Sequence, residues 1–127
     1  MFKISVDTPE TVREAVQYLN GGETGLVMSC MENGKRTGAV AFNIDGNFGY
    51  IETVKADEET MLPVLVSAAM NFLDLHGIRM AVTDDLNHKD VYLRLGFSDL
   101  ENGEKYPLHL SLEGYFEGGC GGKSSKQ

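Results

Sequence analysis

The chain has 127 residues, of which 42% are hydrophobic and 24% charged, proportions that fit one globular domain. Its formal net charge of −8 disfavours binding to nucleic acids or to anionic membranes, because both need clustered lysine and arginine side chains. The sequence shows no apolar run long enough to span a membrane and no signal-peptide pattern at its start, so we expect a cytoplasmic protein.

The first half of the chain predicts a strand, a helix and a three-stranded meander. Residues 2–6 alternate apolar and polar side chains, as a strand does. Thr8, followed by Pro9, is expected to cap a helix that continues to Asn20 and stops at two glycines. The meander strands are predicted over residues 25–31, 37–44 and 48–54, with the hairpin signal Asn33-Gly34 between the first two.

The second half predicts a long buried helix and closing strands. Thr60 is expected to cap this helix, Pro63 fits its first turn, and His76-Gly77 ends it. Its apolar side chains extend almost around the helix, which indicates burial against the sheet. After it we expect a strand over 78–83, a short helix over 88–95 capped by Asn87, and strands over 97–100 and 106–112.

This order predicts an α/β fold with a mixed sheet. The long helix joins the third meander strand to the next strand, so these two strands should be parallel neighbours. Residues 1–116 should form a single domain. Residues 117–127 carry no apolar side chain that could pack, apart from Cys120, and we expect a disordered tail of glycine, serine and lysine.

The order of elements resembles that of the Gcn5-related N-acetyltransferase (GNAT) superfamily, whose fold binds acyl-CoA. The residues that carry the resemblance are Gly77-Ile78, which open a strand, and Tyr92-Leu93-Arg94-Leu95-Gly96-Phe97, which match the Tyr-x-x-x-Gly-Phe pattern of the family. The resemblance covers roughly the last two thirds of the ordered chain. It implies transfer of an acetyl group from acetyl-CoA to a primary amine.

The connection between the meander and the long helix departs from the family pattern. In the family, Arg/Gln-x-x-Gly-x-Gly/Ala at this point brings backbone amides to the pyrophosphate of coenzyme A. Residues 56–64 here contain no glycine and no arginine, but they carry the acids Asp57, Glu58 and Glu59, with Lys55 as the nearby cation. Three carboxylates near a pyrophosphate would weaken its binding about tenfold or more. The same acids also fit the positive end of a helix, without any phosphate.

The resemblance also implies roles for individual residues. Tyr92 would be the acid that protonates the departing thiolate, and Glu52 the base that takes a proton from the amine. Amides near Val54 would contact the acyl carbonyl, and Thr60, Met61 and Leu62 would border the phosphates. The residues alone leave other interpretations open, since Tyr92 could pack the short helix onto the sheet and Glu52 could face solvent.

Other polar residues have a plainer interpretation. Asp84, Asp85 and His88 follow a strand end but lack the spacing of a metal site, so we expect no metal, and the resemblance places Asp85 where asparagine is frequent. His109 is expected to be a strand residue. Cys30 and Cys120 are too differently placed for a disulfide framework.

Two classes of function therefore stay open. In the first, the domain is a GNAT-like acetyltransferase acting on a small-molecule or protein amine. In the second, it keeps the fold, has lost coenzyme A binding, and serves as a non-catalytic binding module. Pairing of two copies through an exposed sheet edge into a homodimer is compatible with either.

Overall fold

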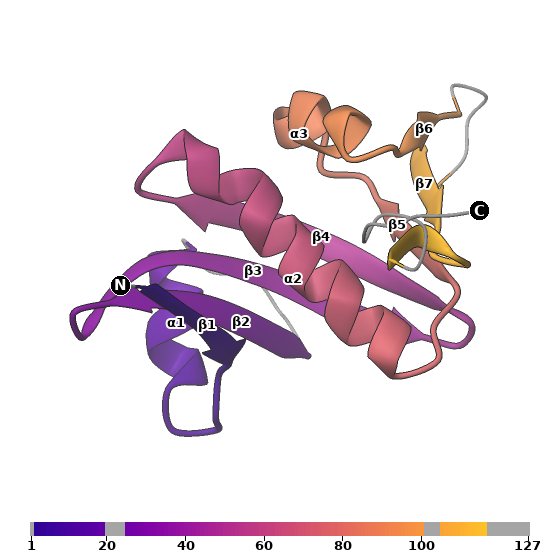
Figure 1. The fold of residues 1–127 in the computed structure, drawn as a ribbon. Coiled ribbons are helices and arrows are strands. Elements are labelled where there is room, and N and C mark those ends of the chain that lie inside the picture. Colours follow the sequence, from indigo (N-terminus) through magenta and orange to yellow (C-terminus); the bar gives the residue numbers. More distant parts are fainter. Residues whose placement is uncertain (1, 20–24, 101–104, 117–127) are drawn as a thin grey trace.

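The computed structural model describes residues 2–19, 25–100 and 105–116, and within this part the chain forms one mixed sheet with helices on both faces (Figure 1). The strand order is β1-β2-β3-β4-β5-β7-β6. The strands are β1 (Phe2–Val6), β2 (Leu26–Glu32), β3 (Lys35–Asp45), β4 (Phe48–Ala56), β5 (Met80–Thr83), β6 (Ser98–Asp99) and β7 (Leu108–Ser111). The helices are α1 (Val12–Tyr18), α2 (Leu62–Leu75) and α3 (Lys89–Arg94), and the short 3₁₀ turns η1 (Glu59–Met61) and η2 (Leu86–His88) precede the last two.

The predicted meander and crossover are confirmed. Strands β2, β3 and β4 pair in antiparallel fashion, and β4 pairs with β5 in parallel after the α2 crossover. The Asn33-Gly34 turn between β2 and β3 has φ values of 54° and 81°, as a two-residue type I′ hairpin requires. The predicted closing pair of strands is present: β7 lies between β5 and β6 and pairs with both in antiparallel fashion.

The predicted caps of α2 and α3 were wrong, whereas Thr8 caps the turn that leads into α1. Helix α1 begins only at Val12, because Thr8 and Thr11 cap a preceding turn through reciprocal bonds, with Thr8 N donating to Thr11 Oγ1 at 3.0 Å and Thr11 N to Thr8 Oγ1 at 3.3 Å. Thr60 lies inside η1 and does not cap α2, whose first turn nevertheless holds Pro63, as predicted. Asn87 likewise lies inside η2, and α3 follows it directly.

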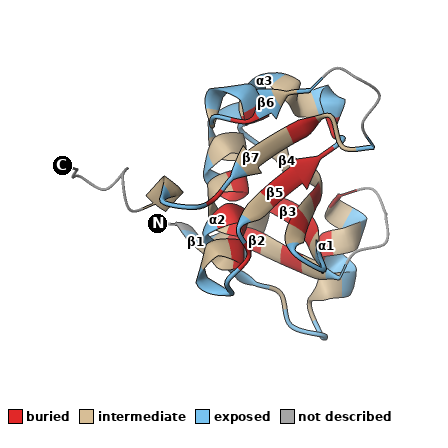
Figure 2. Ribbon diagram, turned by 90° about the vertical axis from the view of Figure 1, so that its right-hand side faces the viewer, coloured by how far each residue is buried: buried red, intermediate tan, exposed pale blue. Residues whose placement is uncertain are grey.

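Alternation along β3 divides the core between the two faces of the sheet. Val40 and Phe42 face α2 and join the main cluster of buried residues, whereas Ala39 and Ala41 face α1. Buried residues therefore concentrate in the central strands and on the inner side of α2 (Figure 2). In the part of the chain that the structure describes, α2 is the longest helix, and no helix has the length and apolar character needed to cross a bilayer. The predicted tail, with Cys120, lies outside the described residues.

Helix α2 approaches β4 closely where a strand residue lacks a side chain. A Cβ atom placed on Gly49 would lie 2.4 Å and 2.6 Å from the two Cδ atoms of Leu73, which is fully buried. Contacts this short do not occur between real atoms, so any larger residue forces Leu73 or the helix to move. Gly49 therefore lets α2 lie close to the sheet at Leu73, as Gly38 does at Leu65.

We expect Gly49→Ala to lower the free energy of unfolding by about 1–3 kcal/mol, because it overpacks this contact. Chemical denaturation measures the change. Leu73→Ala alone should cost about 2–5 kcal/mol, because it leaves a cavity. In the Leu73→Ala background the added methyl group should cost little or stabilise the protein. Equal costs of Gly49→Ala in both backgrounds would contradict this account of the contact.

Candidate functional site

The parallel pairing of β4 with β5 stops halfway along β4. The ladder runs from the pair Phe48–Met80 to the pair Ile51–Thr83, and β4 then continues to Ala56 without a β5 residue opposite it. On the other side of β4, the register with β3 shifts by one residue, so that Glu52 is the extra residue of a β-bulge. A bulge bends its strand and increases the local twist. Strand β5 ends at Thr83, so β4 has no β5 residue beside it from Glu52 onward, and the bulge bends β4 at the point where the two strands separate.

A buried polar network closes the end of the ladder. Thr83 Oγ1 donates to the Ile51 carbonyl at 2.7 Å and accepts from the Asp85 amide at 3.0 Å. Asp85 Oδ2 accepts from the Tyr92 hydroxyl at 3.0 Å and from His88 Nδ1 at 2.8 Å. The network joins β4, β5, η2 and α3 at the point where the two strands separate.

Tyr92, the predicted acid, lies inside this network. It is 0% exposed, and its ring packs edge-to-face against Phe97 with centroids 5.2 Å apart. Burial, followed by the charge of Asp85 and the hydrogen bond to it, raises the pKa of Tyr92 well above the ordinary 10.0 of tyrosine. The hydroxyl is therefore protonated at neutral pH, and its proton points at Asp85.

Glu52, the predicted base, lies close to a second tyrosine at the same strand end. Its Oε1 atom is buried, and its charge is among the causes that raise the pKa of Tyr50, after burial and the hydrogen bond to Asp84. The Tyr50 hydroxyl donates to Asp84 Oδ1 at 2.9 Å, and a charge on Tyr50 would in turn raise the pKa of Tyr92. The fold thus brings the regions of Glu52 and Tyr92 together around Tyr50.

The three acids of the β4–α2 connection point to different places. Asp57 accepts a hydrogen bond from the Tyr18 hydroxyl of α1 at 2.8 Å, and Lys55 donates to the Tyr18 carbonyl, also at 2.8 Å. Asp57 and Glu58 line a cavity of about 290 Å³ beside the β2–β3 hairpin. Glu59 alone of the three lines the larger cavity described next. The three acids of the loop are therefore divided between two cavities.

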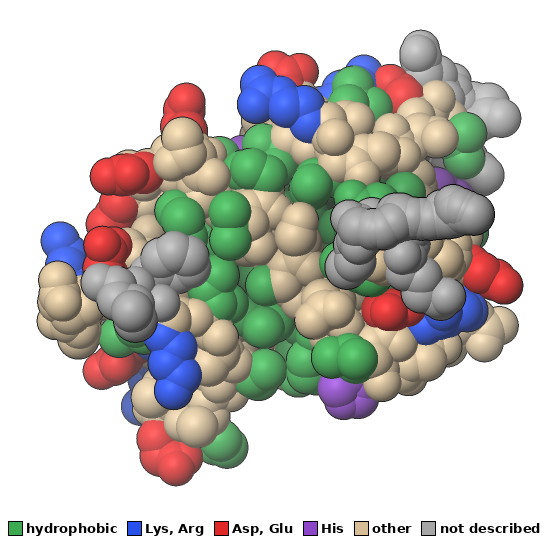
Figure 3. Space-filling view, viewed as in Figure 1, with side chains coloured by type: hydrophobic (Ala, Val, Ile, Leu, Met, Phe, Trp, Pro, Cys, Tyr) green, Lys and Arg blue, Asp and Glu red, His purple; other side chains and the backbone are tan. Residues whose placement is uncertain are grey.

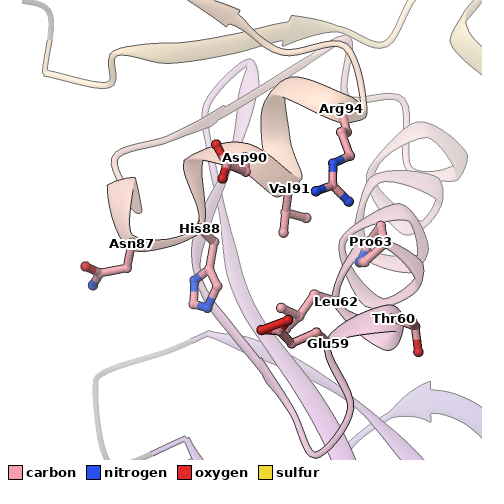
Figure 4. Close-up of a pocket in the computed structure, with 9 residues that line it drawn as sticks. All are labelled: Glu59, Thr60, Leu62, Pro63, Asn87, His88, Asp90, Val91 and Arg94. Carbon is pink, nitrogen blue, oxygen red and sulfur yellow. The ribbon is translucent and has the colours of Figure 1, made fainter.

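The larger cavity lies between the entrance of α2 and helix α3, and has a volume of about 510 Å³. Figure 4 shows its lining from both helices, with the Arg94 guanidinium reaching from α3 toward Pro63 and the Asp90 carboxylate directed away from α2. In the space-filling view, acidic side chains gather over the β4–α2 connection, and basic ones lie over α3 (Figure 3). The lining residues are Glu59, Thr60, Leu62, Pro63, Asn87, His88, Asp90, Val91 and Arg94.

The predicted cofactor contacts lie around this cavity in different ways. Thr60 and Leu62 line it, and Val54 is buried in the core beneath. The amide of Met61 donates to the Glu58 carbonyl at 3.0 Å, and the amide of Leu62 donates to the Glu59 carbonyl. These two donors are therefore used inside η1.

Sequence reasoning missed His88 and Arg94 as residues of this cavity. Asn87, Val91 and Arg94 are spaced by four and three residues, so they share one face of the short helical segment. Tyr92 is buried on the other face. A search of the sequence for cations on the face opposite Tyr92 would have found Arg94. His109 lies in β7, as expected, and Cys30 is buried with a free thiol. No group of three histidine, cysteine or acidic residues in the described part of the chain could hold a metal ion.

Comparison of the sequence with protein-family models gave no match, and comparison with curated proteins gave none. Comparison of the structure with solved structures gave strong similarities to acetyltransferases. The ribosomal-protein-S18-alanine N-acetyltransferase of Escherichia coli matches with a TM-score of 0.67 at 14% identity, over 88% of this chain and 94% of that one. A GNAT-family acetyltransferase of Streptococcus pneumoniae matches with a TM-score of 0.68 at 15% identity, over 87% and 99%.

A GNAT-family acetyltransferase of Brucella melitensis, solved in complex with acetyl-CoA, matches with a TM-score of 0.63 at 16% identity, over 87% of this chain and 88% of that one. The chain therefore has the GNAT acetyltransferase fold, as the sequence resemblance implied. Because the sequence identities are only 14–16%, these similarities establish the fold alone.

Three tyrosines with raised pKa values predict a loss of stability in alkali. Unfolded tyrosines ionise near pH 10, whereas Tyr18, Tyr50 and Tyr92 have raised pKa values in the folded protein and keep their protons. The unfolded state thus releases protons that the folded state retains, so stability present below pH 10 should fall as the pH rises above it. We expect Tyr92→Phe to lower the free energy of unfolding by about 1–3 kcal/mol at pH 7 and to flatten this fall. Denaturation between pH 7 and 11 measures both, and an unchanged alkaline slope would contradict the assignment.

Proposed function

We propose that this domain is an N-acetyltransferase that uses acetyl-CoA and a primary amine on a small molecule or a protein. The observation that carries the proposal is the end of the β4–β5 ladder at Ile51 and Thr83, next to the bulge at Glu52. A closed ladder would leave no backbone on β4 for a bound chain to pair with. Residues 53–56 of β4 therefore form an unpaired stretch on the side of β5, where the described chain places no strand opposite them. The cavity between α2 and α3 is large enough for part of a cofactor.

The separated strands suit the extended pantetheine arm of acetyl-CoA. The arm contains amide groups, and an extended chain with amides can pair with an exposed strand edge. Val54 lies within the unpaired stretch, so its backbone is available for the contact expected from the sequence. The Brucella melitensis protein with this fold was solved with acetyl-CoA, which supports the same class of ligand here.

Acetyl-CoA supplies the acetyl group as a thioester, and the chain supplies proton transfer and charge. Glu52 would accept the proton that the amine loses, because a carboxylate with a buried oxygen at the strand separation can serve as a base. Tyr92 would be the acid that protonates the departing thiolate, as the resemblance implies, and its hydroxyl carries a proton at neutral pH. The carboxylates of Glu52 and Asp84 beside Tyr50 would favour an acceptor that approaches with a positive charge.

One observation favours the second candidate function, a binding module without catalysis. The amides of Met61 and Leu62 are bonded inside η1, Pro63 has no amide hydrogen, and Glu59 lies in the cavity. The entrance of α2 therefore offers fewer donors to a phosphate than a free helix N-terminus does.

Titration with acetyl-CoA separates the two candidates. We expect the transferase to bind acetyl-CoA in calorimetry, and a saturating concentration to raise the melting temperature by about 5 °C or more. The binding module predicts no heat and no shift at millimolar ligand, and that result would remove the transferase.

A substitution at Glu52 tests its role as the base. We expect Glu52→Gln to leave acetyl-CoA affinity within about threefold and to slow amine-dependent release of free thiol by about 100-fold or more, since general bases contribute on that order. Glu113→Gln, an exposed residue after β7, is the control of equal charge change. A Glu52→Gln protein as fast as the Glu113→Gln protein would exclude Glu52 as the base.

A further inference from the structure

The cavity between α2 and α3 contains an arginine that has no acidic partner among the described residues. Arg94 is exposed on the last turn of α3, and no carboxylate of the described chain lies within ion-pair distance of it. Figure 4 shows its guanidinium pointing across the cavity toward the first turn of α2. His88, the other basic side chain of the lining, is bonded to Asp85. Arg94 is thus the free cation of the lining.

The opposite wall of the cavity supplies little that could hold an anion. Backbone amides at a helix entrance commonly bind phosphate, but here the amides of Met61 and Leu62 are used and Pro63 has none. Lys55, the cation nearest in sequence, bonds to the Tyr18 carbonyl and lies over the Tyr18 ring, 4.7 Å from its centroid. An anion that enters the cavity therefore meets Arg94 as its main attractive charge.

We infer that Arg94 binds a phosphate group of coenzyme A in this cavity and replaces the backbone amides of the α2 entrance in that role. The inference rests on the proposed function, because it assigns one contact of that cofactor. A guanidinium is always charged and matches phosphate oxygens with two parallel donors, so one arginine can stand in for several amides. The pyrophosphate and the 3′-phosphate share this chemistry, and the experiment below distinguishes them.

The two acids of the lining set the direction of the expected changes. Glu59 and Asp90 each carry a negative charge, so with Arg94 the ionised groups of the lining sum to about −1, and without it to about −2. Removing Arg94 should weaken phosphate binding, and removing the charge of Glu59 should strengthen it. Glu58, the neighbouring acid, lines the other cavity and provides a matched comparison.

The test is calorimetry on the whole chain with acetyl-CoA, acetyl-3′-dephospho-CoA and S-acetylpantetheine. We expect Arg94→Gln to bind acetyl-CoA at least about tenfold more weakly than the unaltered protein does, because this is the loss typical of a charged hydrogen bond. Both proteins should bind S-acetylpantetheine equally well, because this ligand has no phosphate. A tenfold difference that persists with acetyl-3′-dephospho-CoA assigns Arg94 to the pyrophosphate, and one that disappears assigns it to the 3′-phosphate. Arg94→Lys should bind with intermediate affinity.

Control variants make the result specific. Arg13→Gln removes an exposed arginine on α1, across the sheet, and should leave all three affinities unchanged. Glu59→Gln should tighten acetyl-CoA binding by about three- to tenfold, whereas Glu58→Gln should change the affinity less. This pair of variants tests the charge argument even if an Arg94 variant fails to fold.

Equal acetyl-CoA affinity of Arg94→Gln and the unaltered protein would overturn the inference while leaving the proposed function intact. An equal loss for S-acetylpantetheine would also overturn it, because the residue would then act on the shape of the cavity. Failure of the unaltered protein to bind any of the three ligands would remove the proposed function and the inference together.

Discussion

The site depends on the extra residue in β4. Because Glu52 has no counterpart in β3, β4 bends where its pairing with β5 ends, and the Thr83 hydroxyl completes the last rung by donating to the Ile51 carbonyl. Strand β5 has four residues and pairs with β4 along its whole length, so the second half of β4 has no β5 residue beside it. The bulge bends β4 where this exposed side begins, and it places the Glu52 carboxylate at that point.

The polar network beside the bulge serves the fold and the proposed chemistry together. Tyr92 bonds to Asp85 and packs against Phe97, so it fixes α3 onto the end of β5. The same burial raises the pKa of its hydroxyl, so Tyr92 stays protonated at neutral pH.

The acids of the β4–α2 connection repel an anion at the α2 entrance less strongly than their number in the sequence indicates. The bond from Tyr18 holds Asp57 toward α1, and Glu58 lines the smaller cavity. Glu59 is the acid of the loop that lines the larger one, opposite Arg94 of α3. At separations of several ångströms, moving two of three like charges to other surfaces changes an anion's binding free energy by about 1 kcal/mol or more. Side-chain direction, rather than the count of acids, decides the electrostatics.

The sequence by itself determined the order of strands and helices, the Asn33-Gly34 hairpin, the parallel crossover and the two candidates Glu52 and Tyr92. The elements, the hairpin and the crossover follow from local patterns, namely alternation, helical spacing and turn residues, which act over a few positions. The candidates Glu52 and Tyr92 come from the resemblance to the GNAT superfamily. The tertiary structure decided the bulge, the directions of Asp57, Glu58 and Glu59, and the position of Arg94 opposite Pro63. It also moved the helix starts away from Thr60 and Asn87, where short 3₁₀ turns precede the helices. Each depends on the register of a partner strand or on contacts between residues far apart in the chain, which no local pattern encodes.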